Sequence, residues 1–402
     1  MDFEKLLNKS APDLEESRRS FNDIDGGVYT HDGLQLLKYN GTSQIYYVKP
    51  GCKVIRGLAF NRNTSIHTIV LPDSVEVICY KAFSDSNVSV VVLPDSVRKF
   101  GERVFWGCRN LVSIILPKYL LEIPEATFQS CSNLKDVRLP ISLQTIGEFA
   151  FANCDELRNI SLPNSLTYIH RGAFSDCPEL EDLSFPTSLR EIGSEAFAHC
   201  HSLKNVIIPE GVRVVDGSFF DCENLESISM PSTVVKMQFN GVAGCPKLKR
   251  FIVSPQNRNY KMLNGILYGD NMRTLERCYN NSIEMVDIPN GVTKIQASAF
   301  CDCTNLYYVR FPDSVISIGE QAFMLCPISN INLPSRLSYI GLQAFFKHSA
   351  LEIKIPTSVQ TIKDYAFEGR WLKKIIIPRG KMHFFKPMFS GWNQQAHLLV
   401  EE

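Results

Sequence analysis

"IGEFAFANCDELRNISLP" spans residues 146–163, and "IHRGAFSDCPELEDLSFP" spans residues 169–186. Both stretches carry isoleucine, phenylalanine, cysteine, leucine and proline at the same places, 23 residues apart. Self-similarity at a fixed period of this length is typical of repeat architectures. These two stretches therefore predict a chain that is built from short, stacked units.

The period holds over most of the 402 residues, with one interruption. The prolines that end an apolar run are Pro50, Pro72, Pro94, Pro117, Pro140, Pro163, Pro186, Pro209 and Pro231, and then Pro289, Pro312, Pro334, Pro356 and Pro378. The phenylalanines in register are Phe60, Phe83, Phe105, Phe128, Phe151, Phe174, Phe197 and Phe219, and then Phe300, Phe323, Phe345, Phe367 and Phe389.

Each unit is too short to bury its own apolar face, so neighbouring units must stack into a solenoid. Two segments per unit alternate apolar and polar residues, as in "NLKDVRLP" (133–140) and "SLQTI" (142–146), and this alternation predicts half-buried strands. The stretch "GEFAF" (147–151) between successive strands predicts a tight bend. The predicted fold class is a mostly β repeat solenoid with short parallel strands in each coil.

The cysteines follow the same period. Nine of the thirteen are Cys108, Cys131, Cys154, Cys177, Cys200, Cys222, Cys245, Cys303 and Cys326, spaced by 22 or 23 residues apart from one gap of 58. A disulfide framework does not have this spacing, and a catalytic thiol is not copied once per repeat. We therefore expect a structural ladder of buried, reduced thiols.

The repeating unit "LP-x-S-[VL]-x-x-I-G-x-x-A-F-x-x-C-x-x-L" resembles that of the BspA-like leucine-rich-repeat family, from about Gly51 to Ser390. The resemblance implies a leucine-rich-repeat solenoid that curves as a right-handed superhelix. It also implies a bacterial protein with binding or adhesive roles, often at the cell surface.

Two hairpins are predicted to open two arrays. One is "GGVYTHDGLQLLKYN" (26–40), with its turn at residues 31–33, and the other is "NGILYGDNMRTLERCYN" (264–280), with its turn at 269–271. The expected organisation is an N-terminal helical cap over 1–24, a first hairpin and array over 25–254, a second hairpin and array over 255–390, and a C-terminal cap over 391–402. The N-terminal helix is expected over residues 10–21 with Ser10 as N-cap, and Trp392 and Leu398 are expected to cover the last coil.

Charge and hydropathy exclude several classes of partner. Lys and Arg together number 42, as do Asp and Glu, so nothing in the charge favours nucleic acid. No stretch approaches the roughly 20 apolar residues that span a bilayer, and the N-terminus lacks the apolar region of a secretion signal. The sequence therefore predicts a cytoplasmic monomer without membrane insertion, whereas the resemblance implies the cell surface or secretion.

Catalytic and cofactor-binding motifs are absent, which predicts a protein that is not an enzyme and needs no cofactor. His199-Cys200-His201 looks superficially like a set of metal ligands. Since Cys200 belongs to the ladder and should point inward, alternation turns both histidines away from it. No metal site is predicted, because ligands must converge on one point.

Binding is therefore expected on exposed strand positions. The residues on either side of the inward Val or Ile in the "L-x-x-V-x-L-P" strand form a row, and the first-ranked candidates for partner contact are Tyr308 and Arg310, followed by Arg138, Asn159, Asn332 and Lys354. The expected partner is a protein; a glycan-binding surface adhesin is the alternative. Each of these side chains taken singly also fits an ordinary solvated sheet face. On the other strand, Glu191 and Arg213 are expected to form a charge pair between adjacent coils.

Overall fold

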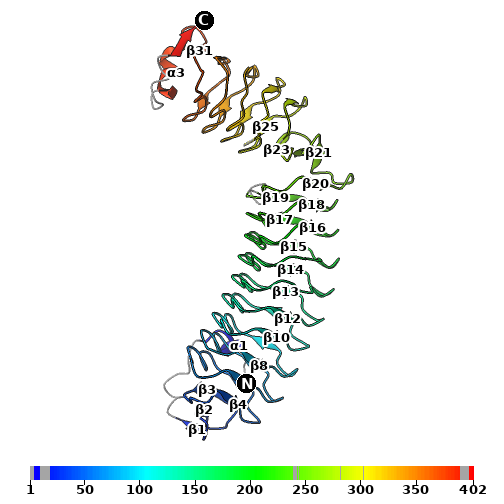
Figure 1. Cartoon of the computed structure of the whole chain (residues 1–402), viewed down its shortest axis with the longest axis vertical. Coiled ribbons are helices and arrows are strands. Elements are labelled where there is room, and N and C mark those ends of the chain that lie inside the picture. The colour runs from blue at the N-terminus through cyan, green and yellow to red at the C-terminus, as the bar shows by residue number, and fades with distance from the viewer. Residues whose placement is uncertain are drawn as a thin grey trace. The chain divides into compact units, whose positions relative to one another are not determined.

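The computed structural model describes residues 4–9, 19–238, 242, 244–280, 282–301, 303–389 and 398–402. The chain forms two compact units, Met1–Leu248 and Lys249–Glu402, and in each of them parallel strands stack coil upon coil (Figure 1). In the described residues the α-helices are α1 (Glu4–Leu7) and α3 (Met382–Phe389). Within that part of the chain, neither these nor any other helix has the length and apolarity to cross a membrane. The predicted mostly β solenoid is confirmed.

One strand of each coil precedes the phenylalanine turn, and these strands are called row A. In the first unit they are β5 (Val54–Ile55), β7 (Val77–Ile78), β9 (Lys99–Phe100), β11 (Glu122–Ile123), β13 (Thr145–Ile146), β14 (Tyr168–Ile169), β15 (Glu191–Ile192), β17 (Val214–Asp216) and β19 (Lys236–Gln238). In the second they are β25 (Lys294–Ile295), β27 (Ser317–Ile318), β28 (Tyr339–Ile340) and β30 (Thr361–Ile362). Equivalent residues pair in parallel, so that Ile146 lies between Ile123 and Ile169.

The other strands form row B. In the first unit they are β4 (Ile45–Tyr47), β6 (Thr68–Val70), β8 (Val90–Val92), β10 (Ser113–Ile115), β12 (Asp136–Arg138), β16 (Asn205–Ile207) and β18 (Ser227–Met230). In the second they are β20 (Arg250–Val253), β24 (Met285–Asp287), β26 (Tyr308–Arg310), β29 (Glu352–Lys354), β31 (Lys374–Ile377) and β32 (Leu399–Glu401). The predicted alternation is present, since Val137 is buried between exposed Asp136 and Arg138.

The bend between the strands has a regular backbone. Phe149 and Asn153, two residues before and after Phe151, have φ angles of 53° and 58° in the left-handed region. The amides of Phe149, Phe151 and Asn153 then donate to carbonyls of the next coil at 2.9, 2.8 and 2.9 Å. The amides between them donate within their own coil. Hydrogen bonds along the solenoid axis therefore compensate a backbone conformation that costs about 1–2 kcal/mol per residue.

The phenylalanines form a continuous column inside each unit. Phe151 lies 5.2 Å from both Phe128 and Phe174, measured between ring centroids, with ring planes within 10° of parallel. Equivalent contacts run from Phe60 to Phe219 and from Phe300 to Phe367. These rings are among the largest fully buried side chains of the protein, and aromatic side chains of this size contribute strongly to core stability.

The serine of the "P-x-S" motif links neighbouring coils through its side chain. Ser165 Oγ donates to the carbonyl of Leu143 at 2.6 Å, and Ser188 Oγ donates to that of Leu166 at 2.6 Å. The proline carbonyl closes the same turn, since Leu166 N–H donates to Pro163 O at 3.0 Å. A small hydroxyl at this position therefore satisfies a carbonyl that lies two residues before the row A strand of the preceding coil.

Both predicted hairpins are present, each extended by a third antiparallel strand. β1 (Ser20–Asn22), β2 (Gly27–Thr30) and β3 (Gln35–Tyr39) form the first meander, and β21 (Lys261–Leu263), β22 (Ile266–Gly269) and β23 (Thr274–Cys278) form the second. The last strand of each meander pairs in parallel with row A. Tyr39 places its ring 5.4 Å from that of Phe60 and so begins the phenylalanine column.

The chain ends differ from the sequence expectation. Most of the helix expected over residues 10–21, including Ser10, lies outside the described residues, but Ser20–Asn22 is a strand because it pairs with β2 and Phe21 stacks on Tyr29. The short helix α1 was not predicted, and its Leu6 and Leu7 pack against Val54, Val77 and Cys79 on the flank of the coils.

At the C-terminus the expectation of a cap over 391–402 falls partly outside the described residues, as does Trp392. Leu398 packs against the core of the second unit. The strand β32 pairs in parallel with β31, so the terminal residues add a strand to row B. The helix α3 buries Phe385 and Phe389 beneath it.

The expected pair between Glu191 and Arg213 is wrong. Glu191 lies opposite Val214, and Ile192 lies opposite Val215. The repeat at this point is one residue shorter, and the missing residue falls in the turn before Phe219 rather than in the strand. The strand was located in the sequence by counting backward from Phe219, and Arg213 was therefore placed where Val214 lies.

Phe151→Ala should destabilise the first unit by about 3–5 kcal/mol, because it removes a ring packed between two others. Urea denaturation measures the loss of stability, and limited proteolysis should show new cleavage in the adjacent coils first. Phe149→Ala is the matched control, since that ring is only half-buried and should cost far less. If both variants lost the same amount of unfolding free energy, the phenylalanine column would not be the main source of stability between coils.

Candidate functional site

The ladder cysteines share one contact. Cys154 Sγ donates to the carbonyl of Phe128 in the preceding coil at 3.3 Å, and Cys177 Sγ donates to that of Phe151 at 3.1 Å. The same bond is made by Cys108, Cys131, Cys200, Cys222, Cys245 and Cys326. Cys303 follows Phe300, the first phenylalanine of the second column. Its thiol is hydrogen-bonded to the thiol of Cys278 in the preceding hairpin.

These thiols are placed for structure rather than reaction. All nine are free, and all are buried except Cys245, which is half-buried. Burial raises the pKa of Cys108 and Cys177 to about 12, and it raises the pKa of Cys131, Cys154 and Cys200 well above the usual range. A thiol with such a pKa carries almost no thiolate at neutral pH, and the thiolate is the nucleophile and the metal ligand.

His348 occupies the ladder position in the second unit. Ala350 N–H donates to its Nδ1 at 3.0 Å, so Nε2 carries the proton and donates to the carbonyl of Phe367 at 3.1 Å. Gly369 leaves room for the ring, because a Cβ there would lie 2.7 Å from it. Burial lowers the pKa of His348 to about 4. The ring is therefore a neutral structural substitute for cysteine.

Row B of the second unit brings together four of the six candidate binding residues. Tyr308 is half-buried and Arg310 is exposed at the two ends of β26. Asn332 lies on the next coil, which is joined to β26 and β29 by single bridges, and Lys354 ends β29. These side chains share one face, as the alternation predicts.

This face has a cavity where the strand pairing of row B is reduced to single β-bridges. A cavity of about 960 Å³ lies over Asn330, Asn332, Glu352, Lys354 and Arg379, and Ile331, Leu333, Leu351 and Ile376 form apolar parts of its wall. The coil at 330–332 has the sequence Asn-Ile-Asn, and asparagine is unfavourable in strands. Lys354 Nζ pairs with a carboxylate oxygen of Glu402 at 3.0 Å at the edge. Sequence reasoning missed Arg379 and Glu402, which lie outside the regular motif.

The other two candidates, Arg138 and Asn159, lie on row B of the first unit. Arg138 ends β12, and Asn159 is bridged to Asp182 where the row is again reduced to a single pair. A cavity of about 610 Å³ covers this part, lined mainly by polar residues: Asn159, Ser161, Asn164, Asp182, Ser184, Thr187 and Asn205, with Phe185. Among the residues that the structure describes, row B therefore has a hollow in the first unit as well as in the second.

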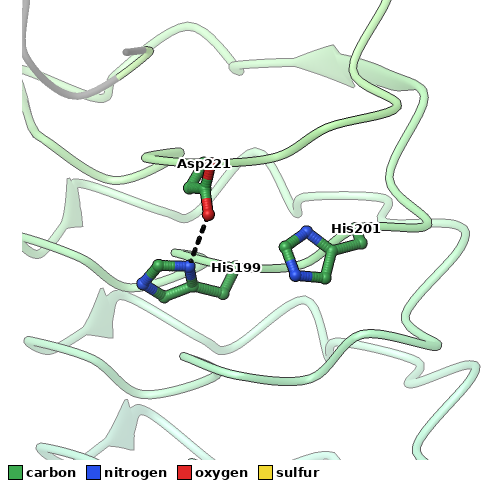
Figure 2. Close-up of side chains that lie close together, drawn as sticks. All are labelled: His199, His201 and Asp221. Atoms are coloured by element: carbon green, nitrogen blue, oxygen red, sulfur yellow. Dashed lines mark hydrogen bonds and ion pairs between the residues drawn. The ribbon is translucent and has the colours of Figure 1, made fainter. Parts of the chain in front are cut away.

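A third group of side chains lies at the phenylalanine turn. Figure 2 shows the imidazoles of His199 and His201 side by side on one coil, with the carboxylate of Asp221 on the neighbouring coil. His199 Nδ1 and Asp221 Oδ2 are 3.0 Å apart. From the sequence, the two histidines were judged by their direction relative to Cys200, whose thiol points inward as expected. Asp221 was missed because it lies one repeat further on, although it also directly precedes a ladder cysteine.

Alkylation of the folded protein should leave the ladder thiols unmodified at pH 8, because their raised pKa values and burial suppress the thiolate. Mass spectrometry after brief treatment with N-ethylmaleimide should find Cys301, which is half-exposed, modified before Cys154. Unfolding should expose all thirteen thiols. Disulfides between ladder positions, or rapid labelling of Cys154 in the folded state, would contradict this ladder.

Acid should weaken the second unit through His348. Its folded pKa of about 4 lies below the unfolded value of 6.5, so the unfolded state binds the proton more readily. The stabilisation is complete above pH 6.5 and is lost as the pH falls toward 4, by up to about 3 kcal/mol. His348→Cys should flatten this part of the stability profile, as measured by urea denaturation of the full chain with proteolytic readout around residue 348. An unchanged profile would rule out this histidine as the cause.

Two solved bacterial structures have a similar fold. A leucine rich cell surface protein of Faecalibacterium prausnitzii is 24% identical, with a TM-score of 0.56, over 89% of this chain and 86% of that one. A leucine-rich repeat protein of Bacteroides ovatus is 24% identical, with a TM-score of 0.53, over 95% of this chain and 97% of that one. No curated protein matches the chain. At this identity the two structures establish the fold alone.

The family itself follows from the sequence pattern. A family model described as "BspA type Leucine rich repeat region (6 copies)" matches residues 53–177, 144–262 and 275–394, which is most of the chain. The matched ranges contain the phenylalanine column, the cysteine ladder, the strands of row A and those of row B except β4 and β32. The chain belongs to the BspA-type leucine-rich-repeat family.

Proposed function

We propose that this repeat scaffold binds a protein partner through row B of its second unit and has no catalytic activity of its own. The observation that carries the proposal is the cavity of about 960 Å³ on the face that holds Asn332 and Lys354. Its size is that of a pocket for a short chain segment, and its wall combines apolar side chains with a few polar groups.

The chemistry of the wall favours a peptide segment. Ile331 and Leu333 offer apolar contact, the amides of Asn330 and Asn332 can pair with a peptide backbone, and row B is interrupted there. Charges of both signs lie at the rim, including Lys354 and Glu402. The described residues that line this cavity include no aromatic ring, the group on which sugars usually stack. An extended segment with apolar and charged side chains is the occupant that these groups complement.

Adhesion at a cell surface is the setting that we favour for this contact. The family resemblance implies such roles, and the Faecalibacterium structure carries the name of a cell surface protein. Tyr308 and Arg310, on the coil before the cavity, extend the same face with residue types that are enriched at interface centres.

Glycan binding is the second candidate, and the hollow of the first unit favours it. Asn159, Asp182 and Ser184 supply amide, carboxylate and hydroxyl groups in one cavity, and Phe185 is beside them. Hydrogen-bonding groups around one aromatic ring suit a sugar better than an apolar peptide. Substitutions in this hollow should therefore abolish glycan binding, whereas substitutions in the cavity near Lys354 should not.

The test compares two double variants with the same chemistry. Asn332→Ala with Lys354→Ala removes an amide and an ammonium from the cavity, whereas Gln360→Ala with Lys363→Ala removes the same groups near row A of the same unit. Folding should be preserved in both, because all four side chains are exposed. Calorimetric titration with the partner isolated by cross-linking should show about 2 kcal/mol weaker binding for the first pair, which is roughly thirtyfold in Kd.

Tyr308→Ala with Arg310→Ala is expected to weaken binding as well, since both residues lie on the adjoining coil. Equal losses from the row A pair would show that the two faces are not distinguished. Glycan binding would replace protein binding as the proposed function if two results were obtained together. Both row B double variants would bind the partner normally, and Asn159→Ala with Asp182→Ala would lose a glycan-array signal.

A further inference from the structure

We propose that His199, His201 and Asp221 form a binding site for one divalent transition-metal ion of the zinc type. One atom of each side chain lies within 4.8 Å of the other two, and His199 Nδ1 is 3.0 Å from Asp221 Oδ2. The three residues are half-buried, so that they are sheltered and still accessible to an ion from solvent. The site lies at the phenylalanine turn and is separate from the row B surface.

The solenoid itself brings His199 and Asp221 together. Each directly precedes a ladder cysteine, and each has a left-handed backbone, with φ of 58° and 54°. Since this turn repeats in every coil, residues at the same position lie above one another along the axis. His199 N–H also donates to the carbonyl of Phe220 at 2.9 Å, which fixes the spacing of the two coils. The pairing of imidazole and carboxylate is therefore built into the repeat.

His201 completes the group from the same coil as His199. Its Nδ1 is shielded from solvent and has no hydrogen-bond partner in the described part of the chain. Its backbone is held in place, because the side-chain amide of Asn224 donates to the His201 carbonyl at 2.7 Å. The two imidazole centroids are 6.2 Å apart, with the rings edge to face (Figure 2). A buried nitrogen without a partner normally costs free energy, and a metal ion would satisfy it.

Gly244 leaves room for the carboxylate of Asp221. It holds the equivalent turn position in the next coil, and a Cβ there would lie 2.4 Å from Asp221 Oδ1. Any larger residue at this position would displace the carboxylate. The sequence His, Asp, Gly at successive turn positions thus lets the carboxylate of Asp221 lie beside His199.

The geometry suits zinc-like ions. Metal–ligand distances of about 2.0–2.2 Å in a tetrahedral site require ligand atoms about 3.3 Å apart. The separations here run from 3.0 Å up to at most 4.8 Å, so a small rotation of a side chain closes the set. Two imidazoles and one carboxylate favour zinc and its neighbours over Mg²⁺ or Ca²⁺, which prefer oxygen ligands. The fourth position is left for water or for a group from a bound partner.

Cys200 is not among the ligands, although it lies between the two histidines. Its thiol points inward and donates to the carbonyl of Phe174 at 3.2 Å. This separation gives the proposal a spectroscopic signature. Cobalt bound by nitrogen and oxygen shows visible d–d bands without the near-ultraviolet charge-transfer band of a thiolate ligand.

The experiment titrates the full chain with Zn²⁺ by calorimetry and with Co²⁺ by absorption spectroscopy. We expect one equivalent of each metal to bind, without a thiolate band, and Mg²⁺ not to compete. His199→Ala, His201→Ala and Asp221→Asn should each lower zinc affinity at least tenfold. Asp221→Asn keeps the shape of the side chain, so its effect separates loss of a ligand from loss of packing.

His67→Ala is the matched control, because His67 is an exposed histidine of the same unit whose Nδ1 is 3.0 Å from the carbonyl oxygen of Ser65. It should bind zinc as the unchanged chain does. No stoichiometric binding, or binding that all three site variants retain, would overturn the proposal. A strong thiolate band would also overturn it, since the ladder cysteines would then be the ligands.

Discussion

The axial hydrogen bonds of the phenylalanine turn are the constraint on which the rest of the structure depends. Phe151 N–H donates to Ala173 O at 2.8 Å, and this bond recurs in coil after coil. It sets the separation of adjacent coils at a distance where aromatic rings stack, with centroids 5.2 Å apart. The alanine that precedes most of these phenylalanines leaves space for the ring. The apolar column, the cysteine ladder and the two rows of strands all follow from that one spacing.

Much of this architecture could be predicted from the sequence, because period and alternation determine which side chains are inward. Ile146 and Val137 were correctly assigned to the core by that rule. The left-handed residues were not predictable in the same way, since Phe149, Asn153 and His199 are not glycine. Their conformation is dictated by hydrogen bonds to the next coil, which a single repeat does not reveal. Arg213 was misplaced because this repeat is one residue shorter in its turn. The shorter turn changes the spacing between strand and phenylalanine, whereas the pairing of the strands stays the same.

The candidate sites depend on local departures from the repeat, and so they were harder to predict. Asn159, Asp182 and Asn330 reduce row B to single bridges, and both hollows lie there. The side chains of Lys354 and Asn332 were placed correctly on an exposed face, but the cavity depends also on Glu402, which comes from the terminal strand. His199 and Asp221 are far apart in sequence and meet because they share a position in the coil. The two row B cavities therefore lie where the sequence departs from its own repeat.

Amide hydrogen exchange of the full chain tests the central claim most directly. The account predicts that the amides of Phe149, Phe151 and Asn153 exchange as slowly as those of row A, because each donates to the neighbouring coil. The equivalent amides in the other coils should behave alike. Fast exchange at Phe149 and Asn153, at the rate of an exposed loop, would contradict the axial hydrogen bonds and with them the spacing from which the fold is derived.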